Sequence, residues 1–245
     1  MKKVAGTVLS IPYYLFFFLL LLVFHPVQVI SRHLGGYTAH KRSVEIMNFL
    51  LLQNLCILGT RISFHGFDRI PEGRPLIIVS NHQSSMDIPP IIWCFRKWHP
   101  KFISKKELGR FIPSISYNLR HGGSILIDRS NRQQAVKEIS LLGERIEKNR
   151  HSACIFPEGT RSRDGVVRHF RIAGMAALLK NAPSALVVPF AVDGNYRLYM
   201  KGSKLLNAGQ RVRYAALAPI EQEGRSVEDI VEQCELAIRK ELGQA

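Results

Sequence analysis

An uncharged apolar segment near the start of the chain constrains its fold more than any other feature. Residues 4–30 contain no Asp, Glu, Lys or Arg, and residues 13–24 are apolar on every helical face. A helix needs about 20 apolar residues to cross a bilayer, so this segment is long enough to insert into a membrane. A secretory signal peptide would need small residues at a cleavage site, and residues 25–30 offer none. We therefore expect residues 4–30 to be retained and to enter a membrane.

A second, shorter apolar segment covers residues 46–59 and is interrupted by amide side chains. Two arrangements fit the two segments: a single span followed by an interfacial helix, or a helical hairpin that dips into one leaflet. Pro12 and Pro26 are expected to bend or end helices in the first segment. We assign residues 1–59 to an N-terminal membrane anchor and residues 60–245 to an α/β domain.

Basic residues flank the first apolar segment unequally. Lys2 and Lys3 precede it, whereas Arg32, Lys41 and Arg42 follow it. Because positive charge near a membrane segment favours the cytoplasmic side, the larger domain is expected to face the cytoplasm, at the cell inner membrane.

The chain is strongly basic, with 34 Lys and Arg against 19 Asp and Glu and a formal net charge of +15. Such a charge indicates an anionic partner: nucleic acid, a phospholipid surface or a phosphorylated substrate. No helix-turn-helix, zinc-finger or RNP pattern occurs, so nucleic acid is not expected as a partner. The 4 cysteines are scattered, which excludes a disulfide framework and fits a reducing cytosol.

From residue 60 onward, short apolar runs alternate with helical patterns. This alternation predicts an α/β fold with a mixed, largely parallel sheet flanked by helices, following the N-terminal membrane-inserted helical segment. The expected strands cover residues 61–66, 75–80, 101–104, 124–127, 153–156, 185–192 and 210–217. The expected helices cover residues 131–148, 172–180 and 226–242, the last beginning at a capping box of Ser226 and Asp229.

His82 and Asp87 follow the expected strand 75–80 across a strand-to-helix turn. If the turn folds back, the carboxylate binds one imidazole nitrogen and fixes the tautomer, which leaves the other nitrogen free to act as a base near neutral pH. The alternative is an ordinary capped turn with a solvent-facing histidine. No further ligand residues accompany the pair, so no metal is expected.

Two further strand ends carry arginines, namely Arg129 after residues 124–127 and Arg161 after residues 153–156. Each could be a solvated loop charge or could pair with a nearby acid. A planar guanidinium also suits bidentate contact with phosphate, and Gly159 lets backbone N–H groups approach an anion. The loop around Gly159 is not a Walker A sequence, so nucleotide hydrolysis is not expected.

Taken together, four segments resemble the four sequence blocks of the glycerolipid acyltransferase family, the 1-acylglycerol-3-phosphate acyltransferases and their relatives. The blocks are Asn81 and His82 through to Asp87, Gly123 to Arg129, Phe156 to Ser162, and Val187 to Pro189. The resemblance implies that His82 is the general base and Asp87 its orienting partner. It further implies an acceptor-phosphate site at Arg129, Glu158, Gly159, Thr160 and Arg161, a substrate-pocket position for Lys105, and a buried strand near the acyl donor at Pro189.

By the same resemblance the chain would be a 1-acylglycerol-3-phosphate O-acyltransferase of phospholipid biosynthesis. It would move a fatty acyl group from acyl-CoA or acyl-carrier protein to the 2-hydroxyl of lysophosphatidate, needing no cofactor beyond that co-substrate. The alternatives are another lyso-lipid acceptor, such as a lyso-ornithine lipid or a different lysophospholipid, and a non-catalytic lipid-binding membrane protein. Ser84 and Ser85 lie outside a G-x-S-x-G elbow, so a covalent acyl-enzyme is not expected.

Overall fold

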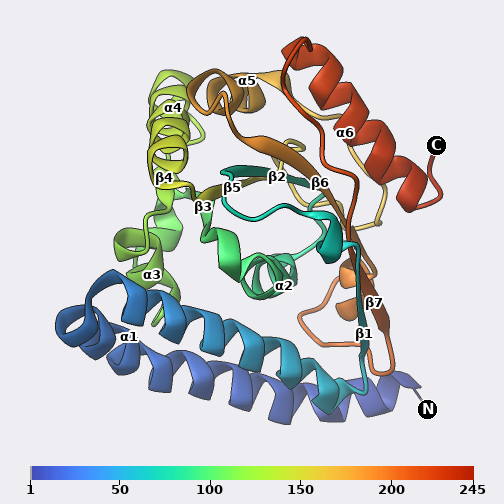
Figure 1. The fold of residues 1–245 in the computed structure, drawn as a ribbon. Coiled ribbons are helices and arrows are strands. Elements are labelled where there is room, and N and C mark those ends of the chain that lie inside the picture. Colours follow the sequence, from blue (N-terminus) through green and yellow to red (C-terminus); the bar gives the residue numbers. More distant parts are fainter. Residues whose placement is uncertain (1) are drawn as a thin grey trace.

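A seven-stranded sheet forms the centre of the computed structural model, which describes residues 2–245 (Figure 1). The spatial order of the strands is β1-β7-β6-β2-β5-β3-β4. Neighbouring strands pair in parallel except β6 and β7, which are antiparallel, so the predicted mixed, largely parallel sheet is confirmed. The strands are β1 Arg61–His65, β2 Leu76–Ser80, β3 Pro100–Lys105, β4 Ile125–Ile127, β5 Ser152–Ile155, β6 Leu186–Asp193 and β7 Arg211–Ala216.

Helices cover both faces of the sheet (Figure 1). α4, α5 and α6 pack on one face, where Ile77 and Val79 of β2 join their apolar side chains; α2 and the N-terminal helix pack on the other, against Leu76 and Ile78. Burial on both faces explains why β2 is an unbroken apolar run rather than an alternating one. The helices are α1 Lys2–Asn54, α2 Ile88–Cys94, α3 Ile115–His121, α4 Arg132–Asn149, α5 Ile172–Asn181 and α6 Val227–Glu241.

Local sequence signals account for several of these elements. At α6, the Ser226 side chain accepts a hydrogen bond from Asp229 N, which confirms the predicted capping box. Sequence patterns did not reveal α2 and α3, each of which is only 7 residues long. Short 3-10 turns complete the chain: η1 Leu55–Leu58, η2 Phe67–Arg69, η3 Ser85–Asp87, η4 Arg96–Trp98, η5 Lys106–Gly109 and η6 Asn195–Leu198.

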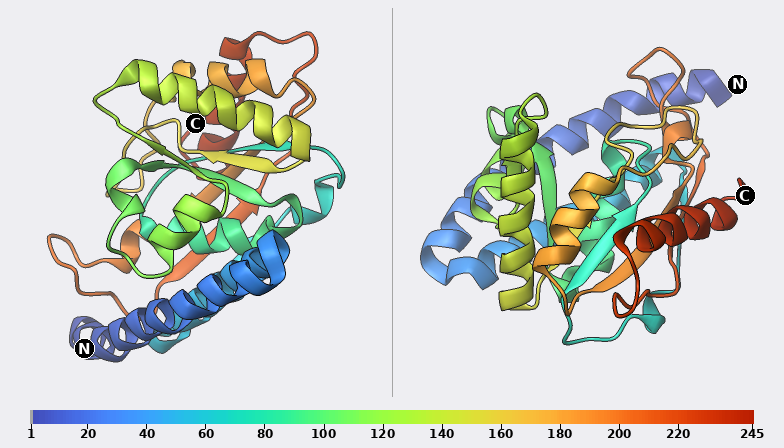
Figure 2. Two further views of the ribbon diagram at one scale, coloured as in Figure 1. Left: turned by 90° about the vertical axis from the view of Figure 1, so that its left-hand side faces the viewer. Right: turned by 90° about the horizontal axis from the view of Figure 1, so that it is seen from above.

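The N-terminal helix α1 is folded back on itself. It continues through Pro12 and Pro26 and is interrupted at Gly36, whose φ of 67° and ψ of −154° are accessible essentially only to glycine. The two halves run side by side in opposite directions as a helical hairpin (Figures 1 and 2). Asn54 Nδ2 donates to Tyr13 O across the hairpin at 3.0 Å.

One side of this hairpin packs on the α/β layer, and the other side is open. Tyr13 is only 2% exposed and donates through its hydroxyl to Met86 Sδ, while Ser10 Oγ accepts from Leu206 N. The outward side carries exposed aliphatic and aromatic side chains such as Leu15. By length and composition α1 could cross a membrane. The hairpin therefore combines a core-packed side with an unpartnered apolar one.

Candidate active site

Five parallel strands end at one edge of the sheet and bring distant loops together there. β6, β2, β5, β3 and β4 all run in the same direction, so the segments after their carboxyl ends share that edge. These segments carry His82 after β2, Glu158 and Arg161 after β5, and Arg129 after β4. The structure thus brings the predicted residues from three separate blocks to one place.

His82 and Asp87 form the predicted pair within the turn after β2. His82 Nδ1 lies 2.7 Å from Asp87 Oδ2, and the Asp87 carboxylate is fully buried. The same oxygen accepts hydrogen bonds from Gln83 N and Ser84 N. The Ser84 side chain accepts from Met86 N and so caps the N-terminus of η3. Because a carboxylate oxygen only accepts, Nδ1 donates a proton to Asp87 Oδ2. The turn is capped, as in the alternative interpretation, but its histidine contacts Asp87 and is not directed only to solvent.

The other side of the His82 ring is also defined. The ring stacks on Phe156 with centroids 4.1 Å apart, and Arg161 Nε lies 3.4 Å from His82 Nε2. A guanidinium N–H can only donate, so this contact agrees with an unprotonated Nε2. The imidazole thus presents an accepting nitrogen beside a cation at the sheet edge.

Asn195, which sequence reasoning missed, completes the surroundings of Asp87. Asn195 Nδ2 donates to Asp87 Oδ1 at 2.7 Å, and Asn195 Oδ1 accepts from Tyr214 OH at 2.8 Å. All three side chains are fully buried. The only local signal was an amide side chain two residues beyond the apolar strand that contains Pro189.

Glu158 joins the loop after β5 to His82 through a hydrogen bond. Its Oε1 accepts from His82 N at 2.8 Å and its Oε2 accepts from Arg168 N at 3.1 Å, with the residue only 2% exposed. Burial raises the pKa of Glu158 to about 7, although these backbone N–H donors oppose the shift. Both carboxylate oxygens are engaged by backbone, so the structure places Glu158 behind His82 rather than facing an anion.

Three arginines carry positive charge around the loop after β5: Arg161, next to His82, and Arg129 and Arg171, near Gly159. Arg129 Nη1 donates to Gly159 O at 2.8 Å, and burial together with the charges of Arg161 and Arg171 lowers the pKa of Arg129. Within residues 2–245, none of the three forms an ion pair with a carboxylate. Uncompensated guanidinium groups of this kind fit an anionic ligand. Arg171 was not among the predicted site residues.

Comparison with known proteins identifies the family of this chain. A family model described as Acyltransferase matches residues 61–193. The chain belongs to the acyltransferase family. The resemblance to glycerolipid acyltransferases drawn from the four sequence blocks is thereby confirmed.

Named relatives of this acyltransferase are similar along most of the chain. It is 28% identical over 189 residues to 1-acyl-sn-glycerol-3-phosphate acyltransferase alpha of Ovis aries, covering 77% of this chain and 64% of the relative. It is 27% identical over 204 residues to the 1-acyl-sn-glycerol-3-phosphate acyltransferase of Saccharomyces cerevisiae, covering 82% of this chain and 63% of the relative. The matched segments thus span just under two thirds of each relative's length.

A solved structure supports the same fold. The crystal structure of the 1-acyl-sn-glycerophosphate (LPA) acyltransferase, PlsC, from Thermotoga maritima has a TM-score of 0.81 to this chain and 25% identity. The match covers 100% of this chain and 97% of that chain, so it includes the hairpin as well as the α/β layer.

Among the described residues, the side chains of Lys105, Thr160 and Pro189 form no hydrogen bond with His82 or Asp87. Lys105 ends β3 at the same sheet edge and is exposed. Thr160 is exposed in the loop after β5, next to Gly159, whose φ of 71° favours glycine. Pro189 is buried inside β6 opposite Val79, so its position in this structure is within the sheet itself.

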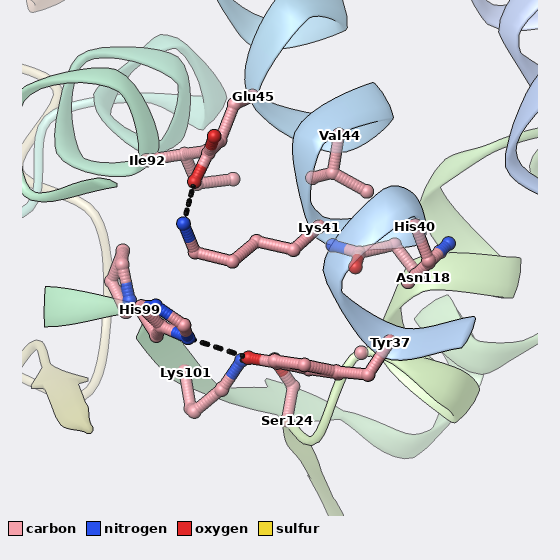
Figure 3. A pocket seen from close by; sticks show the side chains of 12 residues that line it. Tyr37, His40, Lys41, Val44, Glu45, Ile92, His99, Lys101, Asn118 and Ser124 are labelled. Atoms are coloured by element: carbon pink, nitrogen blue, oxygen red, sulfur yellow. Dashed lines mark hydrogen bonds and ion pairs between the residues drawn. The ribbon is translucent and has the colours of Figure 1, made fainter. Parts of the chain in front are cut away.

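A small polar pocket occupies the opposite edge of the sheet, where β3 begins (Figure 3). Tyr37 Oη lies 3.1 Å from His99 Nδ1 there, and Lys101 donates to the same hydroxyl. Burial lowers the pKa of Lys101 to about 8 and that of His99 to about 3. The pocket holds about 30 Å³, which is room for water, and a second cavity of about 290 Å³ shares Tyr37 and Lys101 with it. His82, Asp87 and Arg161 lie at the other edge of the sheet, away from this pocket.

Proposed function

We propose that this chain transfers a fatty acyl group from an acyl thioester to the 2-hydroxyl of lysophosphatidate, giving phosphatidate for phospholipid biosynthesis. One observation carries the proposal: Nε2 of His82, whose ring is oriented by buried Asp87, lies beside Arg161, which has no carboxylate partner among the described residues. The names of the relatives point to the same acceptor.

The proposed reaction needs one positioned base. His82 Nε2 accepts the proton of the 2-hydroxyl as the hydroxyl oxygen bonds to the thioester carbonyl carbon. The tetrahedral intermediate then collapses, the C–S bond breaks, and the leaving sulfur takes the proton from the imidazolium. A thiol with a pKa of about 8.5 leaves readily, so the main task is activation of the alcohol. A positioned histidine contributes typically about 10²–10⁴-fold to such a step.

In this proposal, Asp87 stabilises the protonated histidine and the arginines bind the acceptor phosphate. Asp87 stabilises the imidazolium through its bond to Nδ1. The acceptor phosphate binds Arg161 and Arg129, which draws Arg161 away from Nε2 and frees that nitrogen for the hydroxyl. Fixing the phosphate orients the hydroxyl and lowers the entropic part of the barrier.

The proposed partners follow from this chemistry. Acyl-CoA or acyl-carrier protein serves as donor and co-substrate, lysophosphatidate as acceptor, and membrane phospholipids surround the open side of the hairpin. We place the chain in the cell inner membrane with the His82 edge facing the cytoplasm, because both soluble donors are found there while acceptor and product stay in the bilayer.

The deciding experiment measures thiol release by the full chain in phospholipid vesicles. Acyl-CoA and acyl-carrier protein are each tested with lysophosphatidate, a lyso-ornithine lipid, lysophosphatidylcholine and monoacylglycerol. Lysophosphatidate is expected to give the largest kcat/KM, and monoacylglycerol, which lacks phosphate, the smallest. Absence of thiol release with lysophosphatidate and both donors would refute the proposal, and preference for another lyso-lipid would correct the acceptor.

A further inference from the structure

A strained and exposed aromatic side chain projects from the loop after β3. Phe111 is 96% exposed, more than any other large apolar side chain of the described residues, and its φ is 67°. A bulky residue rarely adopts this left-handed conformation, which is unfavourable for a side chain bearing a Cβ. No packing against the described residues compensates for either feature. The Phe111 side chain is therefore available to contact an apolar partner outside this chain.

The loop that presents Phe111 is held firmly against the hairpin. Ser114 Oγ donates to Leu21 O at 2.6 Å, and Ser114 N donates to His25 Nδ1 at 3.1 Å. Ile112 packs against the hairpin cluster that contains Leu21 and Met47. These contacts fix the loop beside the first half of α1. Phe111 is thus exposed from an anchored loop, not from a free chain end.

The surroundings of Phe111 match the interface of an anionic bilayer. Leu108 of the same loop is 37% exposed, and Lys105, Lys106 and Arg110 are exposed around it, against the single acid Glu107. An aromatic ring among basic side chains suits the boundary between acyl chains and lipid phosphates. The loop also adjoins the hairpin, whose outward side is apolar.

We infer that the loop of residues 106–114 is a second membrane contact, which inserts Phe111 among the acyl chains and sets Lys106 and Arg110 against lipid phosphates. The inference rests on the proposed membrane position of the hairpin. Because the loop leaves the sheet at the same edge as His82, this contact holds the open edge of the sheet against the bilayer. A lysolipid then reaches His82 with its acyl chain still in the membrane.

Tryptophan quenching tests the insertion directly. Full-length Phe111→Trp is bound to vesicles of phosphatidylglycerol and phosphatidylcholine with brominated acyl chains, and the signal of the wild-type tryptophans is subtracted. Strong quenching is expected for Phe111→Trp and none for Leu236→Trp, which lies on α6 across the sheet from the hairpin. Phe18→Trp on the hairpin serves as the reference for membrane binding.

The reference separates the two possible failures. If Phe18→Trp is quenched and Phe111→Trp is not, the loop inference is overturned while the hairpin stays in the membrane. If neither variant is quenched, the hairpin does not lie in the membrane, and both the proposed membrane position and the loop inference are overturned.

Activity provides the second test. Phe111→Asn places a residue tolerant of positive φ in the loop, so its melting temperature should equal or exceed that of the wild type. Turnover of long-chain lysophosphatidate in vesicles should fall about tenfold or more, since the apolar burial of one Phe is lost. Turnover of a short-chain soluble acceptor should not change, and Leu236→Asn should match the wild type on both. An unchanged rate on vesicles, or an equal loss on the soluble acceptor, would overturn the inference.

Discussion

At the scale of single residues, the Asp87 carboxylate holds the candidate site together. It receives hydrogen bonds from His82, two backbone N–H groups and Asn195, and it is fully buried. A buried carboxylate is tolerated only when such donors replace water. The orientation of His82 is therefore a property of the whole turn and not of one contact.

Replacing His82 with Ala should lower thiol release by about 10²–10⁴-fold, because the hydroxyl then lacks its base. Asp87→Asn should also lose most activity, since a neutral amide stabilises the imidazolium poorly. Steady-state thiol release measures both. The His82→Ala chain should keep its unfolding temperature and its membrane recovery, and near-normal turnover by it would exclude the assigned base.

Arg161→Ala should raise the KM for lysophosphatidate far more than the KM for the thioester. Loss of one charge-assisted contact to phosphate costs on the order of 1.5–3 kcal/mol, or roughly ten- to a hundredfold. Arg163→Ala is the matched control, because Arg163 is an exposed arginine of the same loop without a hydrogen bond or ion pair in the described structure. Kinetics that change only the donor KM would contradict the phosphate assignment.

Glu158 should make stability depend on pH. Its carboxyl titrates near 4.5 in an unfolded chain and at about 7 in the folded chain. Between these values the folded state binds more protons, so stability should be highest below pH 4.5 with respect to this group and fall as pH rises through 7. The stability of wild type relative to Glu158→Gln should therefore decrease from pH 5 to pH 8 in denaturant titrations.

Glu223→Gln supplies the control for that titration. Glu223 is exposed in the segment before α6, so its replacement should leave the pH dependence as in the wild type. A constant difference between wild type and Glu158→Gln across this pH range would show that the Glu158 carboxyl titrates normally.

At the scale of elements, the hairpin turn depends on one glycine. Gly36 adopts φ 67° and ψ −154°, and a Cβ added there would meet no atom within 4 Å. The cost of Gly36→Ala is therefore purely conformational, about 1–3 kcal/mol. Thermal unfolding in detergent should show a lower melting temperature for Gly36→Ala, whereas Thr38→Ala on the adjoining exposed helical turn should be close to neutral. Equal stability of both variants would mean that the hairpin turn tolerates a side chain.

At the scale of the whole molecule, the hairpin belongs both to the protein core and to a proposed membrane surface. Tyr13 packs beside Met86, the residue preceding Asp87, so the anchor and the candidate site are in contact. Removing residues 1–59 would uncover this core surface in addition to removing the proposed membrane segment. Tests of membrane binding are therefore better made on the full chain.

Membranes washed with high salt should retain the full chain. Salt screens the attraction between Lys or Arg and lipid phosphates but leaves apolar burial intact. The exposed apolar side of the hairpin, from Val4 to Leu34, is large enough to dominate binding. Immunoblots of pellet and supernatant measure the result, and recovery in the supernatant, or a mature N-terminus beyond residue 30, would refute the anchor.

Much of the fold could be predicted because its signals are local. The apolar run of β2, the 3.6-residue pattern of α4 and the capping box of α6 each depend on residues within one element. Two short helices escaped prediction because 7 residues carry too little periodicity. Proline positions in α1 suggested breaks at Pro12 and Pro26, whereas the chain reverses at Gly36.

The sequence by itself predicted that His82 could pair with Asp87, since both lie in one turn and their spacing of five residues lets the carboxylate reach the ring. It also determined which strands end in arginines. Only the tertiary structure decided that Asn195, from a loop 108 residues away, binds Asp87, and that Glu158 turns inward to His82 N. Such contacts depend on which strands become neighbours in the sheet. Strand order follows from how all the apolar faces are buried together, which no single segment encodes.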